Sequence, residues 1–195
     1  MNPIQFYTSR KWRITSDPTR YSSGVWGMRQ LYSYGIHVDV YCNGYHPAYD
    51  LARYDGAPIE MFADGEVLSG TGWGTFGWQV IVGFADANGK MCQVTFGHVK
   101  DDIPVKVGQK VRKGQVVAYQ GASNNLGVNM ASHLHIQFQP YKWLNEWSLT
   151  CTGINPLKID LDGASAPAST GNVLEYDSAW DWAGKVKLTA NHLYG

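Results

Sequence analysis

The sequence is poor in charge and has no long apolar run, and both shortages narrow the possible functions. Charged residues make up 16% of the 195 residues, and 16 basic residues balance 16 acidic ones. A chain without net charge has no global field to attract nucleic acid or an acidic membrane, so nucleic acid is not an expected partner. No stretch is long enough to span a bilayer, and residues 1–20 lack the apolar segment of a secretory signal. We therefore expect a protein without a transmembrane segment, made in a cytoplasm.

Cysteine is also scarce, and the three present are Cys42, Cys92 and Cys151. Their spacing does not match a zinc knuckle, which needs closely paired cysteines. We expect buried free thiols. A disulfide between Cys42 and Cys151 is the alternative that the sequence leaves open.

Glycine and aromatic residues are abundant, with 22 Gly, 12 Tyr and 8 Trp. Strands favour aromatic residues and tight turns need glycine, so this composition favours a turn-rich β protein over a helical bundle. From residue 57 onward, short β-type runs alternate with turn residues. Hairpin turns are expected at Asp64-Gly65, Asn88-Gly89 and Lys113-Gly114. A short helix is expected only within residues 26–34, and the predicted fold is an all-β antiparallel sandwich or half-barrel.

The two ends of the chain differ from this β-rich middle. Residues 1–43 carry scattered Trp and Tyr among turn residues, and we expect this extension to pack on the domain. The stretch DLDGASAPASTGN (160–172) has the composition of a linker. We therefore predict one domain over residues 1–160 and, over 161–195, a linker or tail toward a further module. Packing of the tail on the domain is the alternative.

Four of the six histidines lie in contexts that suggest shared chemistry. In the expected strand HLHIQF (133–138), His133 and His135 project from the same face, because side chains alternate along a strand. His46 and Asp50 stand four residues apart where a loop runs into a strand, and His98 ends another β run. Each feature alone has an ordinary alternative. His133 and His135 could be a chance pair on the surface, and His46 and Asp50 could form a local hydrogen bond. His98 could be a structural histidine. Two histidines lack any such context and are expected to be structural or exposed: His37 and His192.

Taken together, the segments HPAYD (46–50), FGH (96–98) and HLHIQF (133–138) resemble, in order and content, the lysostaphin/LytM-type zinc endopeptidases. GAPIEMFADGEVLSG and VKVGQKVRKGQVVAYQG are also similar to that family's strand–turn–strand segments, and the resemblance covers residues 44–157. Ala48 and Phe96 depart from the family's usual Gly and Tyr, and neither is at a ligand position. The resemblance implies a LytM-like duplicated β motif whose loops form a narrow groove around a zinc site.

Carried over residue by residue, the resemblance implies that His46, Asp50 and His135 bind Zn²⁺. His98 and His133 would then be the catalytic pair, with His133 as general base and His98 stabilising the oxyanion or protonating the leaving amine. The division of roles between these two imidazoles stays open, because a proton can pass between neighbouring rings.

The groove is expected to bind a slender peptide. Trp73 lies in a Gly-rich loop that can form one wall, and Asn125 lies in the loop 122–132 that can form the other. Ordinary hairpin packing is the alternative for the first loop. Tyr34 and Tyr45 are candidates for a further oxyanion donor.

The function implied is that of a metalloendopeptidase, active as a monomer, that hydrolyses stem or cross-bridge peptides of bacterial peptidoglycan. The aromatic N-terminal segment resembles that of bacteriophage lysins, which implies a phage endolysin acting at the cell wall after release and causing lysis. A non-catalytic LytM-like regulatory or wall-binding module is the alternative. Such relatives usually lack ligand residues, whereas all five positions are filled here. A lipoyl-type carrier is disfavoured because no lysine stands at a suitable hairpin tip.

Overall fold

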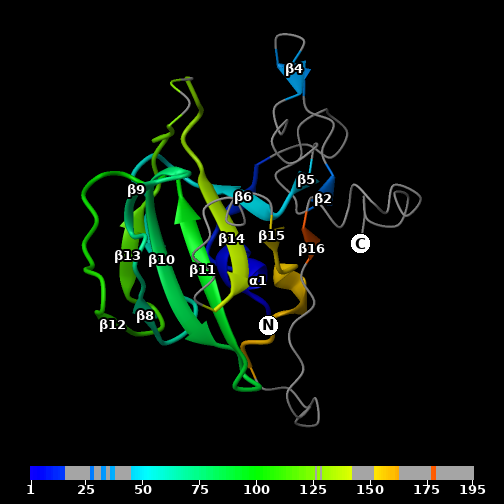
Figure 1. The fold of residues 1–195 in the computed structure, drawn as a ribbon, viewed down its shortest axis with the longest axis vertical. Coiled ribbons are helices and arrows are strands. Elements are labelled where there is room, and N and C mark those ends of the chain that lie inside the picture. Colours follow the sequence, from blue (N-terminus) through cyan, green and yellow to red (C-terminus); the bar gives the residue numbers. More distant parts are fainter. Residues whose placement is uncertain are drawn as a thin grey trace.

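The computed structural model of the chain describes residues 1–15, 45–125, 127, 129–141 and 152–162, and the backbone of short strands at 27–28, 32–33, 36–37 and 177–178. This part of the chain is built around one eight-stranded antiparallel sheet (Figure 1). The order across the sheet is β1-β6-β14-β11-β10-β8-β12, and β9 pairs with β10. The strands are β1 Arg13–Ile14, β6 Ala48–Ala52, β8 Gly65–Val67, β9 Gly72–Gly74, β10 Gly77–Ala85, β11 Met91–Gly97, β12 Lys110–Val111 and β14 Leu134–Pro140. The prediction of an all-β antiparallel fold is confirmed.

Smaller elements surround this sheet. Four two-stranded pairs are formed by β7 Pro58–Glu60 with β13 Val116–Tyr119, β2 Gly27–Met28 with β5 Tyr45–His46, β3 Tyr32–Ser33 with β4 Ile36–His37, and β15 Thr152–Gly153 with β16 Asp177–Ser178. Among the described residues, the helical elements are α1 Pro3–Thr8 and a 3₁₀ turn, η2 Pro156–Lys158. No helix in the described part of the chain is long and apolar enough to cross a membrane.

Apolar and polar residues alternate along the central strands β11 and β14, whereas β10 carries a continuous apolar run, Val80-Ile81-Val82. On β14, Leu134, Ile136 and Phe138 are fully buried in the apolar core. His135 and Gln137 alternate with them and project to the opposite face of the sheet, where they are also buried. One strand thus supplies core packing on one face and the polar side chains of a site on the other.

The hairpin turn predicted at Asn88-Gly89 is confirmed between β10 and β11. The Asp86 carboxylate accepts the backbone N–H groups of Asn88 at 2.9 Å and Lys90 at 2.8 Å, and Gly89 supplies a φ of 79°. This local turn fixes the register that carries the two longest neighbouring strands across the sheet.

The hairpins predicted at Asp64-Gly65 and Lys113-Gly114 are wrong. β7 and β8 flank the first turn but belong to different sheets, as do β12 and β13 around the second. The two turns instead bond to each other: the Lys113 N–H donates to the Asp64 side chain at 2.8 Å and the Gly114 N–H to the Met61 carbonyl at 2.7 Å. The turn residues were identified correctly, but each turn carries the chain from one sheet to the other.

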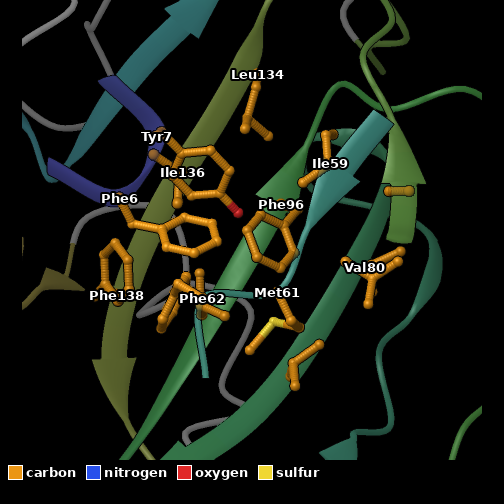
Figure 2. Packing of buried hydrophobic residues seen from close by; sticks show 14 of the residues in the cluster. Phe6, Tyr7, Ile59, Met61, Phe62, Val80, Phe96, Leu134, Ile136 and Phe138 are labelled. Carbon is orange, nitrogen blue, oxygen red and sulfur yellow. The ribbon is translucent and has the colours of Figure 1, made fainter. Parts of the chain in front are cut away.

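The short helix predicted within residues 26–34 is also wrong, because residues 27–28 and 32–33 are strands. The helix that does form, α1, begins at an Asn2–Gln5 capping box followed by Pro3 in the first turn. Its Phe6 and Tyr7 are fully buried against the sheet (Figure 2). The Tyr7 hydroxyl donates to the Glu60 carbonyl at 2.7 Å, so residues 1–15 contribute to the core itself.

Of the three cysteines, only Cys92 lies in the described residues, where it is buried and free, as predicted. Burial raises the pKa of the Cys92 thiol to about 12. Cys42 and Cys151 lie outside the described residues, and their possible pairing stays a prediction.

Candidate metal centre

The first predicted ligands meet because their strands are neighbours. In the antiparallel pair of β6 and β14, Asp50 lies directly opposite His135. The Asp50 Oδ1 atom is 3.2 Å from His135 Nδ1 and 3.3 Å from Nε2 of His46, which ends β5. All three side chains are buried, with 3% of His46, 7% of Asp50 and 6% of His135 exposed. Sequence motifs separated by about 85 residues are therefore joined by one register of strand pairing.

This arrangement fits a bound zinc ion. One donor atom from each of His46, Asp50 and His135 lies within 4.8 Å of the other two. Zinc bonds of about 2.0–2.2 Å place tetrahedral ligand atoms about 3.3–3.6 Å apart, close to the observed separations. Two nitrogens and one carboxylate oxygen are also a donor set that leaves a fourth position open in catalytic sites. The residues thus satisfy both the spacing and the chemistry of such a centre.

The candidate ligand His135 is held by two neighbours, Gln137 and Phe76. Its Nε2 lies 3.2 Å from Oε1 of the fully buried Gln137. Because an amide oxygen only accepts, this contact holds the ring proton on Nε2 whenever a metal ion takes the lone pair of Nδ1, the nitrogen that faces Asp50. The Phe76 ring stacks on the imidazole at 4.3 Å between centroids and 27° between planes. A Cβ added to Gly97 would lie 2.6 Å from Phe76 Cβ, so the close approach requires glycine there.

Two further histidines, His98 and His133, lie beside the candidate ligands. The ring centroids of His98 and His133 are 4.8 Å apart, and His98 is 5.7 Å from His135. His98 Nδ1 lies 2.7 Å from the Ser123 carbonyl, and His133 Nδ1 lies 2.8 Å from the Ala131 carbonyl. Carbonyl oxygens only accept, so each ring carries a proton on Nδ1, and in the neutral form of either ring the lone pair is on Nε2. Each ring is therefore equipped to accept a proton.

The environment also favours the neutral form of His98. Burial, together with the neighbouring His135 and His133 rings, lowers the pKa of His98 to about 3. The side chain is 8% exposed, and its backbone adopts the left-handed conformation with φ of 59°. That region costs a non-glycine residue about 1–3 kcal/mol and persists where surrounding contacts enforce it, as is common at active sites.

The predicted substrate-binding residues are less closely placed. Trp73 is 57% exposed, and its ring meets that of Trp78 edge-on at 5.6 Å where β9 pairs with β10. Asn125 is exposed in the loop after β13. The backbone of Tyr45 pairs with Met28 next to His46, and its side chain is not described. Tyr34 lies outside the described residues, and the binding roles of all four remain predictions.

An antiparallel sheet that gathers a His–Asp–His set and two further imidazoles on one face has the arrangement of a metallopeptidase centre. The profile of Peptidase family M23 matches residues 44–147, which is more than half of the chain. The chain belongs to this family.

Among curated proteins, Endolysin 2638A of Staphylococcus phage 2638A is 29% identical over 170 residues, which are 85% of this chain and 34% of the endolysin. An uncharacterized metalloprotease of Haemophilus influenzae is 29% identical over 122 residues, covering 62% of this chain and 22% of that protein. The chain thus spans about a third or less of the length of these relatives.

Solved structures show the same fold. The catalytic domain of the antimicrobial peptidase lysostaphin from Staphylococcus simulans aligns with a TM-score of 0.50 at 21% identity, covering 71% of this chain and 86% of that domain. A mutant catalytic domain of the prophage-encoded M23 protein EnpA from Enterococcus faecalis aligns with a TM-score of 0.50 at 23% identity, covering 75% and 89%.

Proposed function

We propose that this chain is a zinc-dependent endopeptidase that hydrolyses peptide bonds of bacterial peptidoglycan. The observation that carries the proposal is the convergence of His46, Asp50 and His135 in a buried cluster with two further imidazoles beside it. Membership of Peptidase family M23 and the similarity to a phage endolysin support the same chemistry.

Metal binding involves five residues of the chain. His46, Asp50 and His135 would hold the metal, and Gln137 and Phe76 keep the His135 ring oriented. Zinc, when bound, lowers the pKa of a water ligand to about 7 and polarises a carbonyl oxygen.

The proton transfers fall to the other two histidines. His133 directs its bare Nε2 toward the cluster, 3.9 Å from Asp50 Oδ1, and is the general base that takes a proton from the attacking water. His98, whose ring centroid lies 4.8 Å from that of His133, takes this proton from His133 on Nε2 and passes it to the leaving amine or donates it to the oxyanion. The His98 ring is buried and therefore shielded from bulk water, whereas the His133 side chain is 17% exposed.

The substrate is a stem or cross-bridge peptide of the bacterial cell wall. Exposed Trp73 offers an apolar surface and exposed Asn125 offers backbone-binding amide groups, with Tyr34 and Tyr45 as further contacts. The biological role is that of a monomeric phage endolysin that reaches the wall after release and causes lysis. The non-catalytic alternative has less support, because all five site side chains are present and lie together.

The test is turbidity loss of purified cell walls from several species, with mass spectrometry of the released fragments to identify the cleaved bond. The whole chain should release peptide fragments, lose activity on chelation and regain it with zinc. His135→Ala should lose both zinc and activity, whereas His133→Ala should retain zinc and lose activity. Activity that survives chelation, or that persists in His135→Ala, would refute the zinc assignment.

A further inference from the structure

Ser123 lies where three segments around His98 meet, in a loop that the sequence suggested only as a groove wall. Its hydroxyl accepts the Trp78 backbone N–H at 2.9 Å and donates to the Val99 carbonyl at 2.7 Å. Its own carbonyl accepts from His98 Nδ1 at 2.7 Å. One residue thus bonds to β10, to the residue that follows His98, and to the His98 ring.

These bonds act on a backbone that needs support. His98 has a positive φ of 59°, a conformation that a residue with a side chain rarely adopts. The His98 N–H donates to the Phe76 carbonyl and the Val99 N–H to the Trp78 carbonyl, each at 3.0 Å. The Ser123 hydroxyl links Val99 back to Trp78 and so closes this ring of hydrogen bonds around the strained residue.

The Ser123 carbonyl also selects the tautomer of His98. A carbonyl cannot donate, so Nδ1 must carry a proton, and in the neutral ring Nε2 is then bare. The carbonyl itself is confined, because a Cβ on Gly77 would lie 2.6 Å from this oxygen and 2.5 Å from the carbonyl carbon. The hydroxyl and the carbonyl of the same residue therefore fix both the place and the protonation of the ring.

We infer that Ser123 is a positioning residue, whose clamped hydroxyl holds its carbonyl against His98 so that the bare Nε2 faces the reaction centre. The contribution to rate rests on the proposed function, whereas the tautomer is a property of the folded chain that can be measured without substrate.

The first test reads the tautomer directly. Long-range proton–nitrogen NMR correlation of the zinc-loaded whole chain, with the His98 signals assigned by their loss in His98→Ala, should show His98 protonated on Nδ1. Ser123→Ala should give a mixture of tautomers, and the conservative Ser123→Thr should restore the wild-type pattern. Protonation on Nε2 in the wild-type chain would overturn the inference, even if a variant failed to fold.

The second test is a double-mutant cycle on peptidoglycan cleavage. Ser123→Ala should lower kcat by about 10- to 100-fold, with zinc affinity and KM near wild type, because it disturbs only a proton-transfer group. In the His98→Ala background the same substitution should change kcat by less than about 3-fold, since its target is gone. Ser9→Ala removes a hydroxyl bond to the Phe6 carbonyl away from the site and is the matched control, expected to leave kcat unchanged.

Equal losses in the two backgrounds, or full kcat in Ser123→Ala, would overturn the inference. If Ser123→Ala loses zinc or its folded structure, the wild-type tautomer decides the question. A wild-type chain that cleaves no peptidoglycan but shows the Nδ1 tautomer would refute the proposed function and leave the clamp standing.

Discussion

Replacing Gln137 with methionine should weaken zinc binding without creating a cavity at this buried position. The amide oxygen lies 3.2 Å from His135 Nε2, and Gln137 is 0% exposed, so water cannot replace it. Methionine has a similar length and no strong acceptor. The His135 ring then either buries an unpaired N–H or moves its proton to Nδ1, the nitrogen that faces Asp50.

The expected loss of zinc affinity can be taken from other proteins in which the hydrogen-bond partner of a metal-binding histidine was removed. Loss of a hydrogen bond behind a ligating histidine typically lowers metal affinity by about 10- to 100-fold, equivalent to about 1.4–2.8 kcal/mol. We expect a loss in this range for Gln137→Met. Gln137→Glu should retain or strengthen zinc binding, because a carboxylate is a stronger acceptor for the same N–H.

The assay is competition for zinc against a fluorescent chelator at fixed pH, with thermal melting of the metal-free chain measured in parallel. Gln139→Met is the matched control, because Gln139 is equally buried on the same strand face and its amide oxygen accepts from Gln93 at 3.2 Å. That variant should lose stability but bind zinc normally. A Gln137→Met chain that binds zinc within about 2-fold of wild type would show that the contact does not support the ligand.

Three further predictions concern packing and reactivity. Gly97→Ala should destabilise the chain by about 1–3 kcal/mol and weaken zinc binding, because the new Cβ would lie 2.6 Å from Phe76 Cβ. Urea unfolding measures the first effect and zinc titration the second, and unchanged values of both would refute the close approach. Phe6→Ala should cost about 3–5 kcal/mol of unfolding free energy in urea, since Phe6 is 0% exposed, and a loss below about 1 kcal/mol would place the helix outside the core. Cys92, whose pKa is raised to about 12 by burial, should resist alkylation at pH 8 in the native chain and react in denaturant, as peptide mapping would detect; rapid native labelling would contradict its burial.

The candidate metal ligands could be singled out from the sequence because they lie in short motifs, and the structure brings the three residues together. His133 and His135 share a face by strand periodicity alone, and the ordered resemblance to a family added His46, Asp50 and His98. What the motifs could not supply is the register that sets Asp50 opposite His135. Register depends on the pairing of segments far apart in the chain.

The supporting residues escaped prediction for the same reason. Phe76 stood in a Gly-rich loop that favoured a groove wall, yet its ring turns inward onto His135. Ser123 stood in a polar loop with no motif, and its role arises only when that loop meets Trp78 and Val99. Gln137 did leave a signal, since it follows His135 by two residues and so shares its face.

Turns and helix caps could be predicted from the sequence where their geometry depends only on neighbouring residues. The Asn88-Gly89 hairpin formed as predicted, and the Asn2–Gln5 capping box with Pro3 is a local signal for the start of α1. The turn residues at Asp64-Gly65 also bend the chain as expected. Their strands then pair with different sheets, which a local pattern cannot foresee.

The burial of Phe6, Tyr7 and Trp12 bears on how this peptidase could be transplanted into engineered proteins. The segment that matches the family, residues 44–147, contains all five side chains of the candidate site. The same core also includes residues outside that segment. These are Phe6, Tyr7 and Trp12, which precede it in the sequence, and Ile154 and Ile159, which follow it. A chimera that contained only residues 44–147 would keep the candidate site but lose these residues of the hydrophobic core. The portable unit for domain exchange must therefore include residues 1–15 and extend past Ile159.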